Sequence, residues 1–491
     1  FRSTEQWFIA VDKPLKSTQK TLREMALYSI EHEIDFFPEW GQNRLAGMLE
    51  SRPDWCISRQ RSWGLPIPAF TDGVNVLMTS QSISAVSKII SEEGSDAWFK
   101  KTASELLYHY DKNNDPDFPQ HFNMSLVSKM YDIFDVWFES GSSWNAVLKQ
   151  RQQNFPADLY LEGSDQHRGW FHLSLLPSLA VQKTPPYKQL LTHGFIVDKD
   201  GKKMSKSVGN TLNVQDILNQ YGAEITRWWV GSLSYENDIK VDLTFFDQAS
   251  DSYRKIRNTV RFLLSNLSDL NQSLSLDELS SKVNTFEKNS LESYMIQLTN
   301  ILQKNVMQAY KKYNFKLANQ LIYEFCNDYL SSFYCSISKD ILYCDIKDSI
   351  RRRNIQYCLW AILEVLLRLL SPILPHTAEE AYQALHNDPS LLIFLAEPFT
   401  VHSIERISDW ENLLQKRQDI LKLLEEYKEK GIENSLDAGI IFPESFSYFS
   451  TFNVNLPDFF GVSRVEFRSS DKLDIVNLQH EPRCERSFFY V

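Results

Sequence analysis

The sequence predicts a multidomain protein in which an α/β part precedes an all-α helix bundle and a small α+β tail. Its 491 residues are several times the length of a usual domain, so two to four separate cores are expected. From about 51 to 210, compact apolar strands alternate with helical segments, which is typical of α/β folds. Beyond about 248, long segments with a 3.6-residue apolar period follow one another, and such helices pack as a bundle.

Short apolar runs predict the strands of the α/β part, at 6–11, 55–58, 159–161 and 190–197. Helices are expected around 22–26 and 45–49. Between the strands, about 71–130 is an irregular insertion with clusters of Gly, Asn, Asp and Pro, and the pattern does not define its structure.

The second half of the chain reads as helices. Asn213 caps a helix that ends before Gly222, and a second short helix follows, so 213–247 is expected to be a connector. The tail from 396 begins irregularly and then contains an amphipathic helix and one strand. The periodic segments lie at 250–267, 286–312, 316–340, 350–370 and 376–386 in the bundle, and the tail elements at 410–430 and 439–442.

The composition excludes several classes of protein. No run of about 18 apolar residues offers a membrane span, and the first residues are no secretory signal, so we expect a soluble cytoplasmic protein. A net charge of -11 argues against binding a polyanion by bulk attraction, so a nucleic acid would have to meet local basic patches. The six cysteines lack paired spacing and are expected to be reduced, buried thiols.

A polar loop at 201–210 is the strongest chemical signal. It follows a strand, contains three lysines and two serines, and is bracketed by glycines. Lysine ammonium groups act as point charges for phosphate oxygens, serine hydroxyls add donors, and the glycines let the loop close. A solvated basic turn is the competing interpretation. The residues of this predicted phosphate-binding loop are Lys203, Met204, Ser205, Lys206 and Ser207.

The second signal lies at 160–171, where a strand stops at Gly163 and a helix opens soon after. Ligands of parallel α/β sheets bind at such carboxyl ends of strands. The simpler interpretation makes Ser164 or Asp165 a helix cap and Glu162 a solvated carboxylate.

The string Lys-Met-Ser-Lys-Ser at 203–207 resembles the signature of class I aminoacyl-tRNA synthetases. The string Gly-Ser-Asp-Gln-His-Arg-Gly-Trp-Phe at 163–171 resembles the isoleucyl branch of bacterial type more than its valyl and leucyl relatives. Stretches 52–64, 135–144 and 191–197 are similar to the same family, and the likeness weakens only beyond about 395.

This resemblance implies a domain plan. Residues 51–212 would be the second half of a Rossmann-like catalytic domain, and 1–50 would be the segment that connects it to an editing domain. Residues 213–247 stay a connector, 248–395 would be an anticodon-binding helix bundle, and 396–491 would be a truncated remnant of a zinc module. Thr377, in a stretch that resembles the signature of the bundle, is expected to cap a helix.

The resemblance also implies a reaction, the ATP-dependent ligation of L-isoleucine to tRNA(Ile) through an isoleucyl-adenylate, with Mg²⁺ accompanying ATP. Lys203 and Lys206 would then be catalytic, because they neutralise charge that develops on pyrophosphate. The residues expected to contact the aminoacyl-adenylate are Glu162, Gly163, Asp165, Gln166, His193 and Phe195. A histidine such as His193 on an apolar strand is otherwise a satisfied core residue.

Three arginines provide a candidate tRNA contact. Arg254, Arg257 and Arg261 stand at i, i+3 and i+7 and therefore share one face of a predicted helix. A basic face on an acidic protein fits a tRNA backbone, and a solvated charge face fits the same pattern equally well.

Some family features are missing from these residues. None of the ten histidines stands in the His-x-Gly-His turn with which the family holds ATP, and we expect the chain alone to be inactive. Only Cys484 remains of the family's paired zinc cysteines, so we expect no metal site and no zinc. The expected partners are tRNA(Ile), L-isoleucine and ATP, with no membrane, for a monomeric protein. The alternatives are a non-catalytic tRNA-binding or interaction protein derived from a synthetase, and a valyl-tRNA synthetase.

Overall fold

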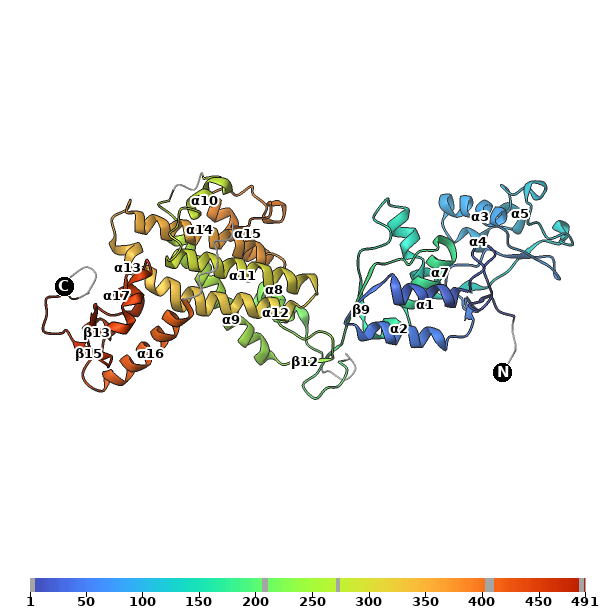
Figure 1. The fold of residues 1–491 in the computed structure, drawn as a ribbon. Helices are drawn as coiled ribbons and strands as arrows, with labels where there is room; N and C mark the ends of the chain where they lie inside the picture. Colours follow the sequence, from blue (N-terminus) through green and yellow to red (C-terminus); the bar gives the residue numbers. More distant parts are fainter. Residues whose placement is uncertain (1–4, 205–210, 271–273, 402–409, 485–489, 491) are drawn as a thin grey trace. The chain divides into compact units, whose positions relative to one another are not determined.

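The computed structural model describes residues 5–204, 211–270, 274–401, 410–484 and 490 (Figure 1). It divides into two compact units. The first consists of Phe1–Phe195 and Tyr235–Asp238, and the second of Ile196–Ser234 and Ile239–Val491. Among the described helices, none is long and apolar enough to cross a membrane.

A three-stranded parallel sheet organises the first unit. Its order is β2 (Asp35–Phe37), β10 (Gln189–His193), β9 (Tyr160–Gly163), so the central strand comes last in the sequence. Apolar side chains of these strands share one core with α1 (Leu22–His32), α2 (Trp40–Glu50) and α7 (Trp170–Gln182).

Short elements complete this sheet region. Strands β1 and β3 pair antiparallel, as do β4 and β8, and α6 packs directly on α7. Their bounds are β1 (Phe8–Ile9), β3 (Trp55–Cys56), β4 (Ser58–Arg59), β8 (Ile133–Phe134) and α6 (Val136–Gly141), followed by a π-helical stretch, Trp144–Lys149.

The insertion at 71–130, whose structure the sequence pattern did not define, has a small core of its own around Phe70, Trp98 and Leu106. Its polar residues build the turns: the Asp72 carboxylate accepts from the backbone N–H groups of Asn75 and Asn123, among others. Its elements are β5 (Phe70–Thr71), β6 (Val76–Leu77), β7 (Ser128–Lys129), α3 (Ser80–Glu93), α4 (Ala97–Lys100) and α5 (Ala103–Leu106), with strand order β6-β5-β7.

The second unit is mainly a helix bundle around α14 (Ile350–Leu370), in which nearly every residue from Ile355 to Leu370 is buried. A small parallel strand pair, β11 (Ile196–Val197) and β12 (Ile239–Lys240), flanks the first bundle helix in the sequence. The bundle helices are α8 (Val214–Gly231), α9 (Leu243–Ser265), α10 (Leu276–Val283), α11 (Leu291–Lys311), α12 (Phe315–Glu324), α13 (Cys335–Cys344), α14 (Ile350–Leu370) and α15 (Pro375–His386), with the π-helix Phe325–Tyr334 between α12 and α13.

Several helix boundaries differ from those that the sequence pattern predicts. Helix α9 begins at Leu243 because the Asp242 side chain caps it, so it starts upstream of the boundary placed at 248. The segment predicted at 286–312 becomes helical only after Ser290, whose hydroxyl caps α11. The segment predicted at 316–340 is divided by the π-helix, whose hydrogen bonds span five residues rather than four.

The expectation that Thr377 caps a helix is wrong. Helix α15 starts at Pro375, so Thr377 lies inside its first turn. The N–H of Thr377 donates to the Glu224 carboxylate of α8 at 2.9 Å, and its hydroxyl lies 2.9 Å from the Tyr253 hydroxyl of α9. The cap therefore comes from a carboxylate that is distant in sequence.

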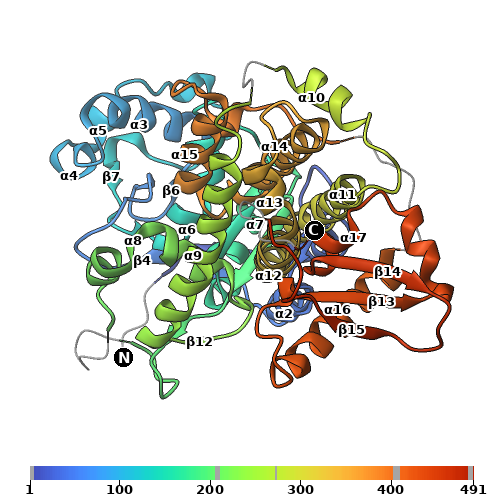
Figure 2. The ribbon, with the colours of Figure 1, turned by 90° about the vertical axis from the view of Figure 1, so that its left-hand side faces the viewer.

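The tail folds as a small α+β structure. Strand β13 lies between β14, to which it is parallel, and β15, to which it is antiparallel, as Figure 2 shows. Buried phenylalanines, including Phe442 and Phe460, fill its core. Its elements are α16 (Trp410–Lys428), β13 (Ala438–Pro443), α17 (Leu456–Phe460), β14 (Arg464–Arg468) and β15 (Asp474–Asn477).

The close packing of α6 on α7 gives a first prediction. A Cβ added at Gly141 would lie 2.0 Å from the Leu173 carbonyl oxygen, so Gly141→Ala should destabilise the first unit by about 1–3 kcal/mol. The control is Gly47→Ala in α2, where a Cβ meets nothing within 4 Å and should stabilise the helix by about 0.5–1 kcal/mol. Hydrogen exchange of α6 and α7 peptides measures both variants, and unchanged exchange in Gly141→Ala would contradict the packing.

Candidate functional site

The carboxyl ends of β9 and β10 lie at the same level. In the parallel register Gly163 pairs with His193 and Glu162 with Thr192. After Gly163 the chain makes a 3₁₀ turn over Ser164–His167 and then enters α7. Both strands thus deliver predicted site residues to one edge of the sheet.

Gly163 lies at the centre of this edge. A Cβ at this position would stand 3.0 Å from Asp165 Oδ1 and 3.4 Å from the Phe195 ring, so both side chains approach the glycine closely. Phe195 is exposed, and its N–H donates to Asp238 Oδ1 at 2.8 Å. The structure therefore brings Gly163, Asp165 and Phe195 together.

Phe195 reaches this place because of the glycine before it. A Cβ at Gly194 would lie 2.2 Å from the Asn237 carbonyl carbon, and the Gly194 N–H donates to the Tyr235 carbonyl at 2.8 Å. Only glycine allows so close a backbone approach. His193, half-buried, donates from Nδ1 to the Gly194 carbonyl at 2.7 Å.

The polar side chains of the turn differ in which of their hydrogen-bonding groups are already used within the protein. Glu162 is exposed, and its carboxylate accepts from the Gly163 N–H at 3.2 Å. Gln166 Oε1 accepts from the Trp170 N–H at 3.0 Å, and Gln166 Nε2 donates to Asp165 Oδ2 at 3.1 Å. Gln166 is thus the cap of α7, and neither Ser164 nor Asp165 provides a side-chain cap there.

A buried histidine, His167, stabilises the turn through a hydrogen bond to its backbone. His167 Nδ1 donates to the Ser164 carbonyl at 3.0 Å, and burial lowers the pKa of His167. Its Nε2 and the Thr192 hydroxyl are both buried without a hydrogen-bond partner in the described part of the chain. Both atoms lie within 4 Å of the place a Cβ would take at Gly41, at the start of α2.

The structure adds neighbours that sequence reasoning did not assign to the site. Trp137 lies against the turn, because its ring is 2.8 Å from the place of a Cβ at Gly169. Gly41 of α2 lies close to His167 and to Thr192 of β10. Local spacing gives no signal for these contacts, since the partners are far apart in the chain.

The lysine loop belongs to the second unit. Val197 forms an antiparallel bridge with Lys203, and Asp198 closes the turn between them by accepting from the N–H groups of Asp200 and Lys202. Lys203 is exposed, and Met204 is half-buried against the core of the helix bundle. Ser205, Lys206 and Ser207 lie outside the described residues.

The three predicted tRNA-binding arginines are exposed on α9, but two of them have acidic neighbours. Arg254 pairs with Asp251 at 3.4 Å, and Arg257 pairs with Glu380 at 3.6 Å. Hydrogen bonding to Tyr253 and the nearby carboxylates raise the pKa of Arg257. The net positive charge of the stripe is therefore smaller than its sequence implies.

Comparisons with known proteins show which family the chain belongs to. A family profile described as tRNA synthetases class I (I, L, M and V) matches residues 1–242, and one described as anticodon-binding domain of tRNA ligase matches residues 292–441. The chain belongs to the class I tRNA synthetases. The predicted resemblance to the isoleucyl enzyme and the predicted fold class are confirmed.

Isoleucine–tRNA ligases of several organisms are similar to this chain. That of Petrotoga mobilis is 41% identical over 487 residues, covering 96% of this chain and 51% of the relative. That of Campylobacter hominis is 40% identical over 448 residues, covering 89% of this chain and 46% of the relative. The chain thus spans about half the length of these curated relatives.

A solved structure shares the fold. The ternary complex of Agrobacterium radiobacter LeuRS with tRNA and LeuAMS matches with a TM-score of 0.50 at 16% identity, covering 85% of this chain and 52% of that chain. Among the described residues, no group of three or more His, Cys, Asp or Glu is arranged to hold a metal ion.

His172 of α7, which follows the turn Ser164–His167, gives a prediction about how stability depends on pH. Burial, assisted by the charges of Arg52 and Arg23, lowers the pKa of His172 to about 3. In the unfolded chain His172 takes up a proton near pH 6.5. Its contribution to the free energy of unfolding is therefore fully present above that pH. Below it, stability falls by about 1.4 kcal/mol per pH unit down to the folded pKa.

His172→Leu should therefore flatten the pH dependence of the first unit's unfolding free energy between pH 6 and 4 by roughly this slope. Urea titrations with hydrogen exchange of α7 as the probe measure it. The control is His32→Gln, which changes an exposed histidine of α1. A variant slope equal to that of the wild type would mean that His172 is hydrated in the folded state.

Proposed function

We propose that the protein carrying this chain ligates L-isoleucine to tRNA(Ile) in the cytoplasm, with ATP, through an isoleucyl-adenylate. The observation that carries the proposal is the identity of about 40% to isoleucine–tRNA ligases along almost the whole chain. The Gly163 edge supports it, because exposed polar groups gather where parallel sheets bind ligands.

At this edge we assign the exposed Glu162 carboxylate to the ammonium group of the amino acid or its adenylate. Asp165 contributes polar contacts beside it. Because Gln166 Oε1 already accepts from Trp170, the group that Gln166 offers a ligand is its second amide hydrogen. Phe195 and His193 line the adenine side.

Lys203 and Lys206 act on the phosphates. In the proposed reaction the isoleucine carboxylate attacks the α-phosphorus of ATP, and negative charge develops on the departing pyrophosphate. Two ammonium groups placed on that charge lower the barrier without any side-chain nucleophile. Mg²⁺ would arrive bound to the ATP phosphates.

The tRNA would meet the helical unit. The match of residues 292–441 to an anticodon-binding domain supports this part of the proposal, and we keep Arg254, Arg257 and Arg261 as candidate phosphate contacts. We further expect a monomer. No observation favours a valyl enzyme, and the isoleucine–tRNA ligases among the relatives argue against it.

The catalytic role of the loop is tested in a fusion. Joined to the part of the Petrotoga mobilis relative that it does not cover, the chain should support isoleucine-dependent exchange of pyrophosphate into ATP. Lys206→Ala should lower the rate by about 10²-fold and leave the KM for isoleucine nearly unchanged, because the loop contacts phosphate mainly in the transition state. Lys199→Ala, in the same hairpin but outside the motif, is the matched control.

Two results would contradict this assignment. A Lys206→Ala fusion with the wild-type rate would remove the role of the loop. Robust exchange by the 491-residue chain alone would contradict the expectation that it is inactive without a His-x-Gly-His turn.

The arginine stripe is tested by tRNA binding to the whole chain. Reversal of Arg254, Arg257 and Arg261 to glutamate should weaken binding and flatten its salt dependence, with the slope falling by about 1 for each phosphate that the variant no longer neutralises. Fluorescence anisotropy over a salt series measures both effects. A triple glutamine variant separates loss of charge from new repulsion against Asp251 and Glu380, and circular dichroism checks that α9 stays folded. Unchanged affinity and slope would make the stripe a solvated face.

A further inference from the structure

Two buried polar atoms of the first unit face the same place behind the turn of the candidate site. They are Nε2 of His167 and the hydroxyl oxygen of Thr192, both next to Gly41 at the start of α2. Both side chains are fully buried, and neither atom has a hydrogen-bond partner in the described part of the chain. Proteins rarely leave such atoms unpaired, because their hydration is lost without compensation. Two of them at one place point to a bound ligand.

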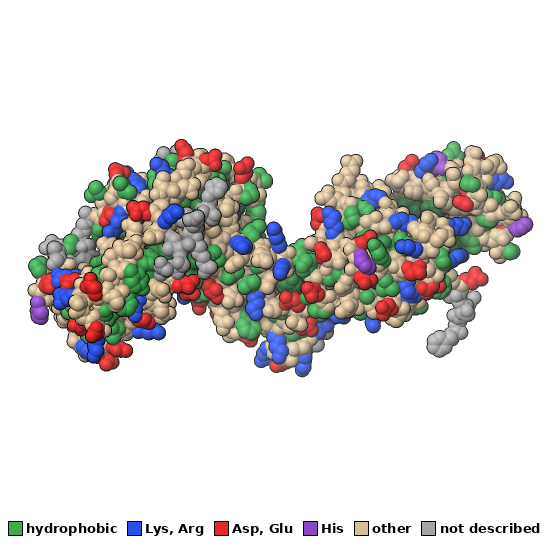
Figure 3. Space-filling view, viewed as in Figure 1, with side chains coloured by type: hydrophobic (Ala, Val, Ile, Leu, Met, Phe, Trp, Pro, Cys, Tyr) green, Lys and Arg blue, Asp and Glu red, His purple; other side chains and the backbone are tan. Residues whose placement is uncertain are grey.

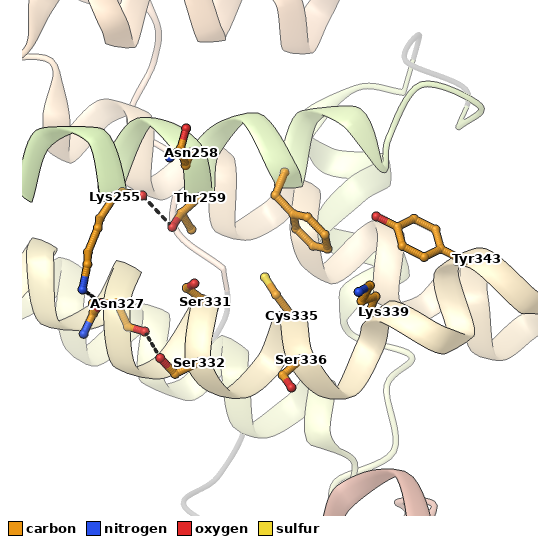
Figure 4. A pocket seen from close by; sticks show the side chains of 11 residues that line it. Lys255, Asn258, Thr259, Asn327, Ser331, Ser332, Cys335, Ser336, Lys339 and Tyr343 are labelled. Carbon is orange, nitrogen blue, oxygen red and sulfur yellow. Dashed lines mark hydrogen bonds between the residues drawn. The ribbon is translucent and has the colours of Figure 1, made fainter. Parts of the chain in front are cut away.

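Polar groups in other parts of the molecule differ in this respect. On the face shown in Figure 3, charged side chains are spread over the surface, where solvent hydrates them. The groove between α9 and α13, drawn in Figure 4, is lined by polar side chains that are exposed or already bonded. Ser331 is exposed, for example, and Lys255 donates to Asn327 at 2.9 Å. That groove therefore does not require a ligand.

The partner of Nδ1 decides what Nε2 of His167 can do. A carbonyl oxygen only accepts, so the 3.0 Å contact with the Ser164 carbonyl places the proton of the neutral ring on Nδ1. Burial is the main cause that lowers the pKa of His167 below its ordinary value of 6.5, which keeps the ring neutral at pH 7. Nε2 is therefore an acceptor without a donor.

Packing prevents the His167 ring from turning toward another donor. Trp40 lies against it with ring centroids 5.7 Å apart, and Phe171 meets it edge-on at 5.5 Å. Nδ1 is held at the same time by the Ser164 carbonyl. The direction of Nε2, toward Gly41, is therefore fixed.

Gly41 leaves space beside these atoms. The place that a Cβ would take at this residue is 3.4 Å from His167 Nε2, 3.4 Å from the Phe36 ring and 3.8 Å from the Thr192 hydroxyl oxygen. These are ordinary van der Waals distances, so one further atom fits among its neighbours. Gly41 has no positive φ, so the lack of a side chain, rather than the backbone conformation, is what glycine provides here.

The chemistry of this space selects water as the ligand. Nε2 requires a donor, and the Thr192 hydroxyl can donate or accept. One water satisfies both atoms, since it can donate one hydrogen to Nε2 and form a second hydrogen bond with the hydroxyl. A larger ligand does not fit a space of one atom that the Phe36 ring also borders.

A water at this place would support the residues that we assign to the amino acid. Asp165 and Gln166 lie inside the 3₁₀ turn Ser164–His167. His167 already ties the end of this turn back to its first residue, and a bridge to Thr192 would tie it to β10 as well. The position of Asp165 and Gln166 at the edge of the sheet would then depend on this contact.

We propose that His167 is a positioning residue of the ligase site and that it acts through one buried water held between its Nε2 and the Thr192 hydroxyl, beside Gly41. The water fixes the turn against β10, and the turn then presents Asp165 and Gln166 to the ammonium group of isoleucine. The positioning role rests on the proposed function, whereas the water site does not.

The water site is tested on the 491-residue chain itself. A high-resolution crystal structure should show one water within hydrogen-bond distance of both His167 Nε2 and the Thr192 hydroxyl. Gly41→Ala should remove this water, because the new methyl group takes up its space. A direct bond from the Thr192 hydroxyl to Nε2, or a space without water, would overturn the site.

The positioning role is tested by pyrophosphate exchange in the fusion with the Petrotoga mobilis relative. His167→Asn keeps an N–H for the Ser164 carbonyl but loses Nε2, and Thr192→Val loses the hydroxyl at nearly equal shape. Each should raise the KM for isoleucine about tenfold and leave kcat and the KM for ATP nearly unchanged, because the ammonium group is bound both before and during the reaction. The double variant should be no worse than either single variant, since both remove the same water.

Three further variants separate positioning from loss of stability. Gly41→Ala should raise the KM for isoleucine by a similar factor, although alanine is the better helix former. Thr192→Ser keeps the hydroxyl and should keep the wild-type KM. Ser178→Ala removes another buried hydroxyl of the same unit, which donates to the Thr184 carbonyl at 2.7 Å, and should at most lower the active fraction without changing the KM.

The outcomes keep this inference apart from the proposed function. If the wild-type fusion is active but His167→Asn and Thr192→Val have the same KM as Ser178→Ala, the positioning role is overturned and the proposed function stands. A wild-type fusion without exchange would overturn the proposed function and the positioning role together. The crystal structure decides the water site in either case.

Discussion

The site of the first unit depends on the parallel pairing of β9 with β10. Because Gly163 stands opposite His193, the two strands end at the same level, and their following residues leave the sheet together. The polar turn after β9 and the Gly194–Phe195 corner after β10 therefore converge. A change of register by one residue would turn the side chains of the strand to the opposite face and separate these groups.

The close approaches at this edge all involve glycine. Gly163 admits the Phe195 ring, Gly194 admits the backbone of Asn237, and Gly41 leaves room beside His167. None of these three has a positive φ, so their role is steric rather than conformational. Small residues allow side chains and backbone from distant segments to meet around one turn.

In the helical unit, a buried carboxylate joins two helices. Glu364 of α14 accepts from Trp360 Nε1 at 2.9 Å and lies 2.8 Å from His386 Nε2 of α15. Burial alone would raise the pKa of Glu364, but His386 and Arg368 outweigh it and leave that pKa below its ordinary value. A buried charge of this kind is stable only while its partners stay in place, which ties α15 to α14.

The local features of this protein could be predicted from its amino-acid sequence: the strand that stops at Gly163, the capped start of the helix after Asn213, the helical periods of the bundle, and the strings that identify the family. These depend on neighbouring residues, whose spacing is visible in the chain. Other features emerged only from the folded chain: β10 lies between β2 and β9, Glu224 caps α15, and acidic neighbours offset the arginines of α9. Each of these is a contact between residues far apart in sequence, and such contacts are set by how whole elements pack.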